Sequence, residues 1–493
     1  MGKRVGIAVL AVCLASAGLF ATGIIGLNFA GVDLSADPRQ LTPPDTMGAV
    51  GPNHIVEFIN GAFAVYNKTT GALIGSVQSD SSFWTSTVGL SSSTLGTSGL
   101  TDTRIQYDPG SGRWFATELT TDSTGNKLLL GISQTSDPTG AWKGTSFTAN
   151  AGFGDFDTLG VDSNAVYIGT NNFTDISGAG GLQSVSLFSI PKSDLTGGSP
   201  TTAHMTSFAD LSTSSGYGFS LQGVNNWGAT TAGTVLAQDL SSASQLDAAT
   251  ITGPGGAGAV LSSPTGVAVG TIQPEPLAFQ PDGTRQIDGS DARIMSRVWQ
   301  VGNLIYEAQE TGVGTGCSFE DSNTSDTSCR LGIRVSVLNA TTLAEVAEGV
   351  LSEAGADYIY PSLAVDSLGN IVLGFTRSCG TGTDPGPCDP SAYAELAKVV
   401  GSNVVFTDTL PLAIGAVGDY HLLGTTPERW GDFSSTVPDP SNPNVFWTFQ
   451  ETAAGQFDWG TQITEIILPE PATAATALAG LAILWLVRRR RRG

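Results

Sequence analysis

Three arginines stand in related positions along the chain, and together they could grip an anionic ligand. Arg104 and Arg293 each lie two residues after an aspartate, and Arg429 lies two residues before Gly431. A guanidinium group holds a carboxylate through two parallel hydrogen bonds, so three of them at one point would suit an acidic sugar. The alternative is that each arginine pairs with a nearby aspartate and joins neighbouring parts of the fold. We favour this second interpretation, which fits Arg377 as well.

Apart from these arginines, the chain has no recognised catalytic motif. Its three histidines, His54, His204 and His421, are far apart in the sequence. The serine-hydrolase pattern GxSxG, the zinc-binding pattern HExxH and the phosphate-binding pattern GxxxxGKS/T are absent. We therefore predict no catalytic residue, no metal site and no cofactor, and we expect a binding protein rather than an enzyme.

Four cysteines beyond the N-terminal segment form two local pairs, Cys317 with Cys329 and Cys379 with Cys388. Each pair lies in a segment rich in Gly, Ser, Thr and Asp, as long loops are. An even number of cysteines in an exported chain predicts two disulfides. A zinc site built from all four thiolates is the alternative, but neither pair has the close CxxC spacing that such sites use.

Composition excludes one class of partner. The formal net charge is −22, and seven of the 22 basic residues lie at the two ends of the chain, so the body is strongly acidic. Such a body repels phosphate backbones, and we predict no nucleic-acid partner. Only 13% of the residues are charged, and the 63 glycines favour short strands joined by tight turns.

A pattern of two short strands around an Asp- or Gly-containing turn recurs along the chain. Its copies begin at Asp45, Asp102, Asp155, Asp291, Asp357 and Gly431, with a looser copy at Gly216. The starts are roughly 50–75 residues apart, enough for four strands each, and units of this size must stack to bury their faces. Radial stacking predicts an all-β fold, a seven-bladed β-propeller over residues 40–467.

Nearly continuous apolar runs should form the strands that are buried between blades. These runs are HIVEFI, RWFATEL, AVYIGT, NLIYEA, NIVLGF and VFWTF. Four large aromatic residues near them are interpreted as packing between blades rather than as sugar platforms: Trp114, Trp299, Trp447 and Tyr306.

Recurrent turn residues receive a structural interpretation too. Asp108, Asp162, Asp366 and Asp439 follow the first strand of their repeats, and an isolated aspartate offers too few oxygens for calcium, so we predict Asx turns. The segment Thr135–Trp142 approaches the Asp-box of sialidase blades, with its glycine one place late, and such boxes are structural turns.

The middle of the chain resembles a family of secreted bacterial propeller proteins that are distantly sialidase-like in architecture. The resemblance is carried by PPDTMGAVGPNHIVEFIN, DTRIQYDPGSGRWFATEL, SQTSDPTGAWKGTSF, YPSLAVDSLGNIVLGFTRS and RWGDFSSTVPDPSNPNVFWTFQE. It implies the fold and says little about activity, because propellers host many functions. A secreted carbohydrate-active enzyme, a sialidase-like glycosidase, is therefore the alternative to a binding or scaffolding module.

The N-terminus has the parts of an export signal. Lys3 and Arg4 precede the apolar run Val5–Leu14, and Ala15-Ser16-Ala17 offers a cleavage site. We expect a signal-peptide helix over residues 1–23, processed by signal peptidase, and an N-terminal extension over residues 24–39.

The C-terminus combines three elements over residues 468–493. Pro469, Glu470 and Pro471 precede the uncharged segment Ala472–Val487. Five arginines follow it: Arg488, Arg489, Arg490, Arg491 and Arg492. The apolar segment predicts a single transmembrane helix, with the arginines fixing the topology on the cytoplasmic side.

This tail resembles the PEP-CTERM sorting signal, which an exosortase-type membrane protease recognises. The resemblance implies that Pro469, Glu470 and Pro471 are the recognised motif and that the helix anchors the chain in the inner membrane before processing. Members of that family are commonly co-regulated with extracellular polysaccharide production. The expected location is the cell surface or extracellular matrix of a biofilm, with polysaccharide as a partner. A permanent membrane anchor that is never cleaved is the alternative.

Overall fold

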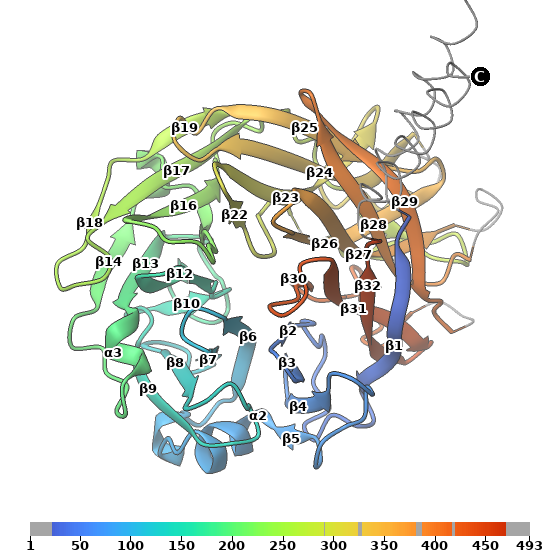
Figure 1. Ribbon diagram of the computed structural model, residues 1–493. Helices are drawn as coiled ribbons and strands as arrows, with labels where there is room; N and C mark the ends of the chain where they lie inside the picture. The colour runs from blue at the N-terminus through green and yellow to red at the C-terminus, as the bar shows by residue number, and fades with distance from the viewer. Residues whose placement is uncertain (1–21, 290, 324–327, 381–386, 417–419, 470–493) are drawn as a thin grey trace, which may run out of the picture.

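Short apolar runs, separated by turns rich in Gly, Asn and Asp, form nearly all the regular structure. The computed structural model describes residues 22–289, 291–323, 328–380, 387–416 and 420–469. Figure 1 shows β-sheets arranged in a ring around a common centre. The fold is therefore all-β and propeller-like.

The N-terminal half contributes four sheets whose strands follow one another along the chain. The first contains β2 (Gly48–Val50), β3 (His54–Ile59), β4 (Ala62–Asn67) and β5 (Gln78–Ser79). The second contains β6 (Leu100–Asp108), β7 (Arg113–Thr120), β8 (Lys127–Ser133) and β9 (Trp142–Thr148). The third contains β10 (Phe153–Asp155), β11 (Gly160–Val161), β12 (Ala165–Phe173), β13 (Ser184–Pro191) and β14 (Thr206–Leu211). The fourth contains β15 (Phe219–Gly223), β16 (Ala232–Gln238), β17 (Gln245–Thr252), β18 (Val260–Leu261) and β19 (Thr265–Ala268).

Two further runs of four strands share one eight-stranded sheet. The first run is β22 (Trp299–Val301), β23 (Leu304–Gly314), β24 (Cys329–Asn339) and β25 (Glu345–Leu351). The second is β26 (Ala356–Val365), β27 (Asn370–Cys379), β28 (Ser391–Val400) and β29 (Asn403–Ala413). Their outer strands β25 and β29 meet through one parallel pair, Glu348 with Asn403. A small hairpin of β20 (Ala278–Phe279) and β21 (Arg285–Ile287) precedes them.

The last sheet joins the two ends of the chain. It contains β30 (Ser435–Pro438), β31 (Val445–Gly455) and β32 (Asp458–Ile467), and its outermost strand is β1 (Ile24–Asp33). The pairing of β1 with β32 runs from Ile24 opposite Ile467 to Asp33 opposite Gly460. Residues 24–33, which we expected in an N-terminal extension, are thus part of the ring, because β1 supplies the fourth strand that β30–β32 lack.

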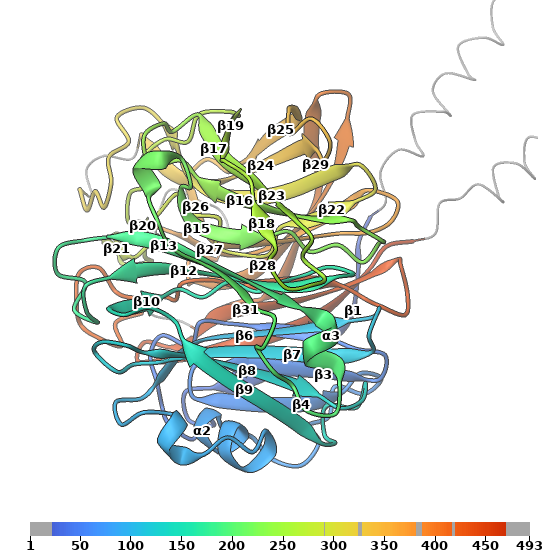
Figure 2. The same ribbon diagram turned by 90° about the vertical axis from the view of Figure 1, so that its left-hand side faces the viewer.

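Helical segments are short and lie between strands. They are α2 (Asp80–Ser82), η1 (Phe83–Thr87), η2 (Ser92–Thr94), α3 (Lys192–Thr196) and η3 (Thr213–Ser215). Figure 2, turned by 90°, shows α2 at one margin of the ring, beside the sheets of β2–β5 and β6–β9. No helix in the described ranges has the length and apolarity that a membrane crossing requires. The predicted signal peptide up to residue 21, and the tail from Glu470 onward with Pro471 and Arg488–Arg492, lie outside those ranges.

The predicted buried strands are confirmed. The six apolar runs form β3, β7, β12, β23, β27 and β31, in which nearly every residue is buried. The outer strand β25 alternates between covered and exposed residues, as a strand with one solvated face does, and most residues of the outer strand β9 are only partly covered. Trp114, Trp299, Trp447 and Tyr306 are at most 2% exposed and pack in the interior, also as predicted.

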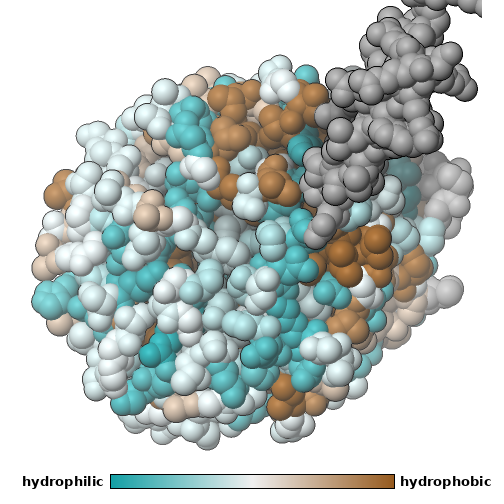
Figure 3. Space-filling view, viewed as in Figure 1, coloured by the Kyte–Doolittle hydropathy of each residue, from teal (hydrophilic) through white to brown (hydrophobic). Residues whose placement is uncertain are grey.

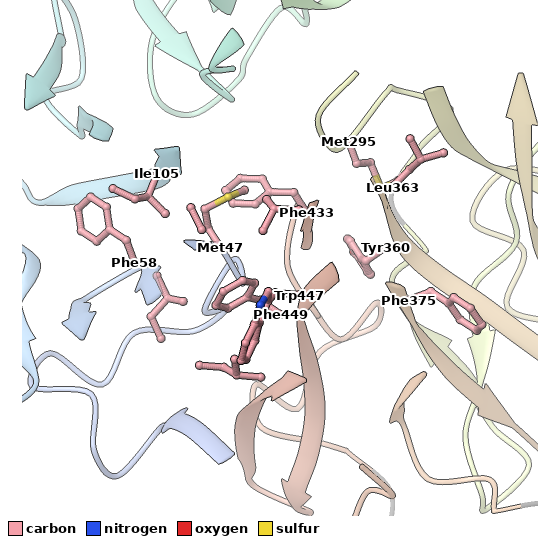
Figure 4. Close-up of a cluster of buried hydrophobic side chains, with 14 of the residues drawn as sticks. Met47, Phe58, Ile105, Met295, Tyr360, Leu363, Phe375, Phe433, Trp447 and Phe449 are labelled. Atoms are coloured by element: carbon pink, nitrogen blue, oxygen red, sulfur yellow. The ribbon is translucent and has the colours of Figure 1, made fainter. Parts of the chain in front are cut away.

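Apolar side chains fill part of the ring's centre. Figure 4 shows Met47 beside Phe433, with Ile105 and Met295 on either side of them. All four are buried. On the surface, Figure 3 shows a largely hydrophilic centre to the face seen in Figure 1, with hydrophobic side chains gathered near its upper and right-hand margins.

The predicted Asx turns are confirmed between first and second strands. Asp108 accepts a hydrogen bond from the backbone N–H of Ser111, and Asp162 accepts one from that of Asn164. In the same way, Asp366 accepts a hydrogen bond from the backbone N–H of Leu368, and Asp439 accepts one from that of Ser441. The segment related to the Asp-box is likewise a turn, in which the buried Trp142 donates its indole N–H to the Pro138 carbonyl.

Both predicted disulfides are present. Cys317 bonds to Cys329 at the start of β24, and Cys379 at the end of β27 bonds to Cys388. Each crosslink closes a loop next to a long hairpin. Disulfides of this kind are typical of proteins in an oxidising, extracellular environment.

Candidate functional site

The loops that lead into the innermost strands bring three aspartates together at one end of the ring's axis. Asp45 precedes β2, Asp102 lies in β6, and Asp432 precedes β30. One carboxylate oxygen of each lies within 4.8 Å of the other two. We call these three residues the aspartate cluster. They come from three different sheets, so only the closed ring assembles them.

The backbone at this end is bent to turn the side chains inward. Asp45 and Asp102 have φ angles of 48° and 59°, and Phe156 has 50°. These values lie in the left-handed region, which residues other than glycine seldom adopt and which occurs often at functional sites. Asp45 and Asp102 open their repeats, so the bend belongs to the repeat itself.

Hydrogen bonds connect the cluster from sheet to sheet. Asp45 accepts hydrogen bonds from the backbone N–H of Asp432 and from the Asn60 side chain, both 2.7 Å long. Asn60 in turn accepts one from the Asp102 N–H at 2.9 Å. Asp102 accepts one from the Phe156 N–H at 2.7 Å. The Asp45 and Asp102 carboxylates are therefore held in fixed orientations by hydrogen bonds from Asn60, Phe156 and the Asp432 backbone.

A cavity of about 510 Å³ opens beside the aspartate cluster. We call it the mouth cavity. Its charged lining consists of Arg39, Asp45, Asp102, Asp155, Asp175, Arg429 and Asp432, and its remaining lining is mostly Ser, Thr, Gly and a few apolar side chains. A polar cavity with two cations and several carboxylates suits a hydroxyl-rich or charged ligand.

Burial and mutual repulsion disfavour the ionised forms of these carboxyls. Burial raises the pKa of Asp45 well above its ordinary value, and the nearby charges of Asp432 and Asp102 raise it further. The pKa of Asp155 is also raised well above its ordinary value by burial and then by Asp102 and Asp432. Arg429 opposes the shift at Asp45, and Arg293 opposes it at Asp155. These shifts favour the neutral forms of the Asp45 and Asp155 carboxyls, so the mouth carries less negative charge than its number of aspartates alone would give.

Two of the three predicted arginines are bound by carboxylates. Arg293 makes a two-pronged contact with Asp291, with both N···O distances at 2.7 Å. Arg429 donates to Asp432 at 2.7 Å, and it alone of the three lines the mouth cavity.

Arg104, the third predicted arginine, is 4% exposed and lies over the Phe433 ring at 3.4 Å. Its Nε donates to the Asp157 backbone carbonyl at 2.7 Å. Arg104 and Arg293 both face the Phe156 ring, so the arginines lie near one another without pointing at one open site. Arg293 and Arg429 thus have the aspartate partners that the structural interpretation expects, whereas Arg104 donates to backbone carbonyls and Arg377 contacts a glutamate, Glu353, at 2.9 Å.

Sequence reasoning missed a fourth arginine near the axis. Arg297 is 7% exposed and reaches three sheets: its guanidinium donates to the Gln106 side chain of β6 at 2.9 Å, to the Gly48 carbonyl of β2 at 3.3 Å and to the Ser435 hydroxyl of β30. Burial lowers its pKa to about 9, and the charge of Arg104 adds to this effect. A charged residue inside the apolar run IMSRVW was the signal that could have found it.

A second and more apolar cavity of about 340 Å³ lies at the other end of β30. Trp227 and Trp299 contribute to it, with ring centroids 5.4 Å apart and planes nearly perpendicular. Asp439 and Pro440, from the turn after β30, form another part of its wall. This cavity is remote from the aspartate cluster and offers a control region for mutations.

No family model matches the chain, and no curated protein matches it either. Solved structures resemble it at low sequence identity. Drosophila Semaphorin 1b, extracellular domains 1–2, is 8% identical, with 91% of this chain and 87% of that chain covered and a TM-score of 0.39. Drosophila Plexin A in complex with Semaphorin 1b is 8% identical, with coverages of 91% and 88% and a TM-score of 0.41. A Trypanosoma rangeli sialidase is 9% identical, with coverages of 72% and 51% and a TM-score of 0.31. With scores this low, the fold assignment rests on the sheets themselves.

Proposed function

We propose that this chain is an exported binding module, a seven-bladed propeller whose mouth cavity holds a polar ligand. The blade number is supported by the repeats, since each of the seven repeat starts in the sequence lies in, or a few residues before, the first strand of a separate run of strands. The observation that carries the binding role is the mouth cavity, in which rigidly oriented carboxylates and Arg39 and Arg429 converge.

The ligand class follows from the lining. Carboxylates accept hydrogen bonds from hydroxyl groups, and arginine donates to hydroxyl or carboxylate oxygens. Phe153 and Phe173 add two aromatic rings to the wall, and the charged and hydroxyl-bearing side chains supply the hydrogen-bonding groups that would give the specificity. We propose an extracellular polysaccharide, bound through its hydroxyl groups.

Binding is tested with the purified full-length chain on an array of bacterial polysaccharides. Arg429→Gln should weaken binding at least about tenfold, because a desolvated charged hydrogen bond is lost. Trp227→Phe, in the remote cavity, serves as the matched control and should leave binding unchanged. Binding that survives Arg429→Gln and Asp155→Asn together would show that the mouth cavity is not the ligand site.

A glycosidase on the same fold is the second candidate, favoured by Asp155. This carboxyl lines the mouth cavity, and its pKa is raised well above the ordinary value, chiefly by burial, as a general acid requires. Hydrolysis of the bound polysaccharide that disappears in Asp155→Asn, while binding persists, would support this candidate. Binding without release of reducing ends would refute it.

We further propose that residues 468–493 are a sorting signal read by an exosortase, with Pro469, Glu470 and Pro471 as its motif. The two disulfides are consistent with export. Intact-mass measurement of the mature protein from its native host decides the matter. A mass that lacks both the signal peptide and the arginine cluster supports sorting, whereas retention of Arg488–Arg492 supports a permanent anchor.

A further inference from the structure

We propose that the aspartate cluster, Asp45, Asp102 and Asp432, holds a divalent cation of the calcium type. The proposal deepens the proposed function, since the cation would lie in the wall of the same mouth cavity. Calcium binds oxygen ligands at about 2.3–2.6 Å, so oxygens on opposite sides of the ion are about 4.6–5.2 Å apart. The three carboxylate oxygens, all within 4.8 Å of one another, have the spacing of such a ligand set.

Glu451 gives a second and independent indication. This residue of β31 is 4% exposed, and its Oε1 is buried without a hydrogen-bond partner in the described part of the chain. A methyl group built on Gly431 would lie 3.3 Å from Asp45 Oδ1 and 3.6 Å from Glu451 Oε2, so both carboxyls face the same small space. A buried carboxyl with no donor costs free energy that a bound cation or its water would offset.

The local charge favours the same conclusion. Asp45, Asp102, Asp432, Asp155 and Glu451 would carry five negative charges in this region if all were ionised. Three arginines oppose them: Arg429 contacts Asp432, the charge of Arg104 acts on Asp102, and that of Arg293 acts on Asp155. The carboxyls outnumber these arginines, so ionised carboxylates repel one another across this region. A divalent cation would remove this repulsion.

The donor set selects among metals. All of its ligands are carboxylate oxygens, which suit calcium or magnesium rather than zinc or copper. Asp432 is partly exposed at the cavity, so coordination positions on that side face the space where a ligand would lie. Calcium accepts six to eight ligands in flexible geometry, whereas magnesium requires a near-ideal octahedron. Calcium is therefore the metal that three fixed carboxylates and a set of ligand hydroxyls can share.

The test uses the full-length chain freed of metal with a chelator and titrated with calcium chloride alone in a calorimeter. We expect one site, with a dissociation constant on the order of 0.1–1 mM, as in extracellular calcium modules. Asp45→Asn and Asp102→Asn should each weaken binding at least about tenfold. Asp137→Asn, at an exposed Asx turn, is the matched control and should not.

Thermal unfolding shows whether a variant has lost only the calcium site or has also lost its folded structure. Asp102→Asn removes a repelling charge, its remaining oxygen still accepts from the Phe156 N–H, and its amide can donate to the Thr101 hydroxyl. In chelator it should therefore unfold at the same or a higher temperature than the parent, and it should lose the calcium-dependent rise. The absence of any calcium heat and of any rise in the parent at 10 mM calcium, roughly tenfold above the weaker expected constant, would overturn the proposal. So would a rise that persists in both variants.

The outcomes also distinguish this proposal from the binding function. Calcium binding without polysaccharide binding would leave the cation site standing and refute the ligand. Polysaccharide binding that chelator does not change, together with no calcium heat, would refute the cation and leave the binding function standing.

Discussion

Glu57 is a carboxyl group buried where three strands meet. It accepts hydrogen bonds from the Val32 N–H of β1 at 3.0 Å, from the Tyr66 hydroxyl of β4 at 2.8 Å and from the Thr461 hydroxyl of β32. Burial raises its pKa to about 7, against the opposing effect of these three donors. Protonation of Glu57 is therefore coupled to the pairing of β1 with β32, which closes the ring.

The sign of the resulting pH dependence follows from that shift. The folded pKa is higher than the unfolded one, so the contribution of Glu57 to stability is complete below about pH 4.5 and is lost as the pH rises through about 7. Glu57→Gln is neutral at every pH. In this variant the new side-chain amide can donate to the Thr461 hydroxyl. The hydrogen of that hydroxyl can then go to the Val32 carbonyl, which lies 2.9 Å away.

We therefore predict that Glu57→Gln gains stability relative to the parent by about 3 kcal/mol between pH 4.5 and pH 8. The measurement is urea unfolding of both proteins at several pH values. A constant difference across that range would mean that Glu57 stays ionised in the folded protein.

At the scale of elements, neighbouring sheets approach closely where small residues allow it. Gly48 of β2 faces Phe449 of β31, and a methyl group placed on it would lie 2.2 Å from that ring. Gly374 of β27 faces Thr448 and Gln450 in the same way. The sheets are packed face to face through these contacts, and a single added carbon would force the backbones apart.

Gly48→Ala should lower the free energy of unfolding by about 1–3 kcal/mol, the usual cost of overpacking a rigid interior. Gly198→Ala is the control, because no atom lies within 4 Å of its added methyl group. Chemical denaturation of the two variants beside the parent gives both values. Equal stability of the two variants would show that β2 can shift away from β31 at no cost.

The sequence predicted the individual strands and turns better than it predicted the contacts between sheets. Strands, Asx turns and both disulfides depend on residues close in sequence, such as Asp366 and Asn370, so the local pattern was enough. The aspartate cluster joins Asp45 to Asp432, 387 positions apart, and depends on which repeats adjoin when the ring closes. The recurring aspartate at the start of the repeats was visible in the sequence. Its neighbours in the sequence, however, gave no indication that its side chain points toward the axis of the ring.

Long-range packing also decided the role of the arginines and the shape of the sheets. Arg297 becomes an axial residue only because β2, β6 and β30 surround it. The merger of two four-strand runs through Glu348 and Asn403 depends on one backbone contact between outer strands, for which side-chain patterning gives no signal.

At the scale of the molecule, the ring depends on β1. This strand pairs with β32 over most of its length, and Val32 and Asn28 add side-chain contacts to Glu57 and Thr464. Without β1, the exposed edge of β32 would carry unpaired backbone groups, and Glu57 would lose a donor.

A chain that lacks residues 24–33 should therefore fail to unfold cooperatively, whereas one that lacks only residues 1–21 should keep the transition of the mature protein. Differential scanning calorimetry compares the two. A sharp transition in the chain without residues 24–33 would show that the ring closes through the remaining three strands.

The pairing of Ile24 with Ile467 also determines how late in synthesis β1 can form its hydrogen bonds. A ribosome makes β1 first and its partner β32 last, so the nascent β1 must wait, unpaired, while the intervening sheets are made. During that interval it is an apolar segment open to chaperones or to a neighbouring chain. Only pairing with β32 protects β1 from such contacts. The last strand to be made therefore determines when the first strand becomes structured.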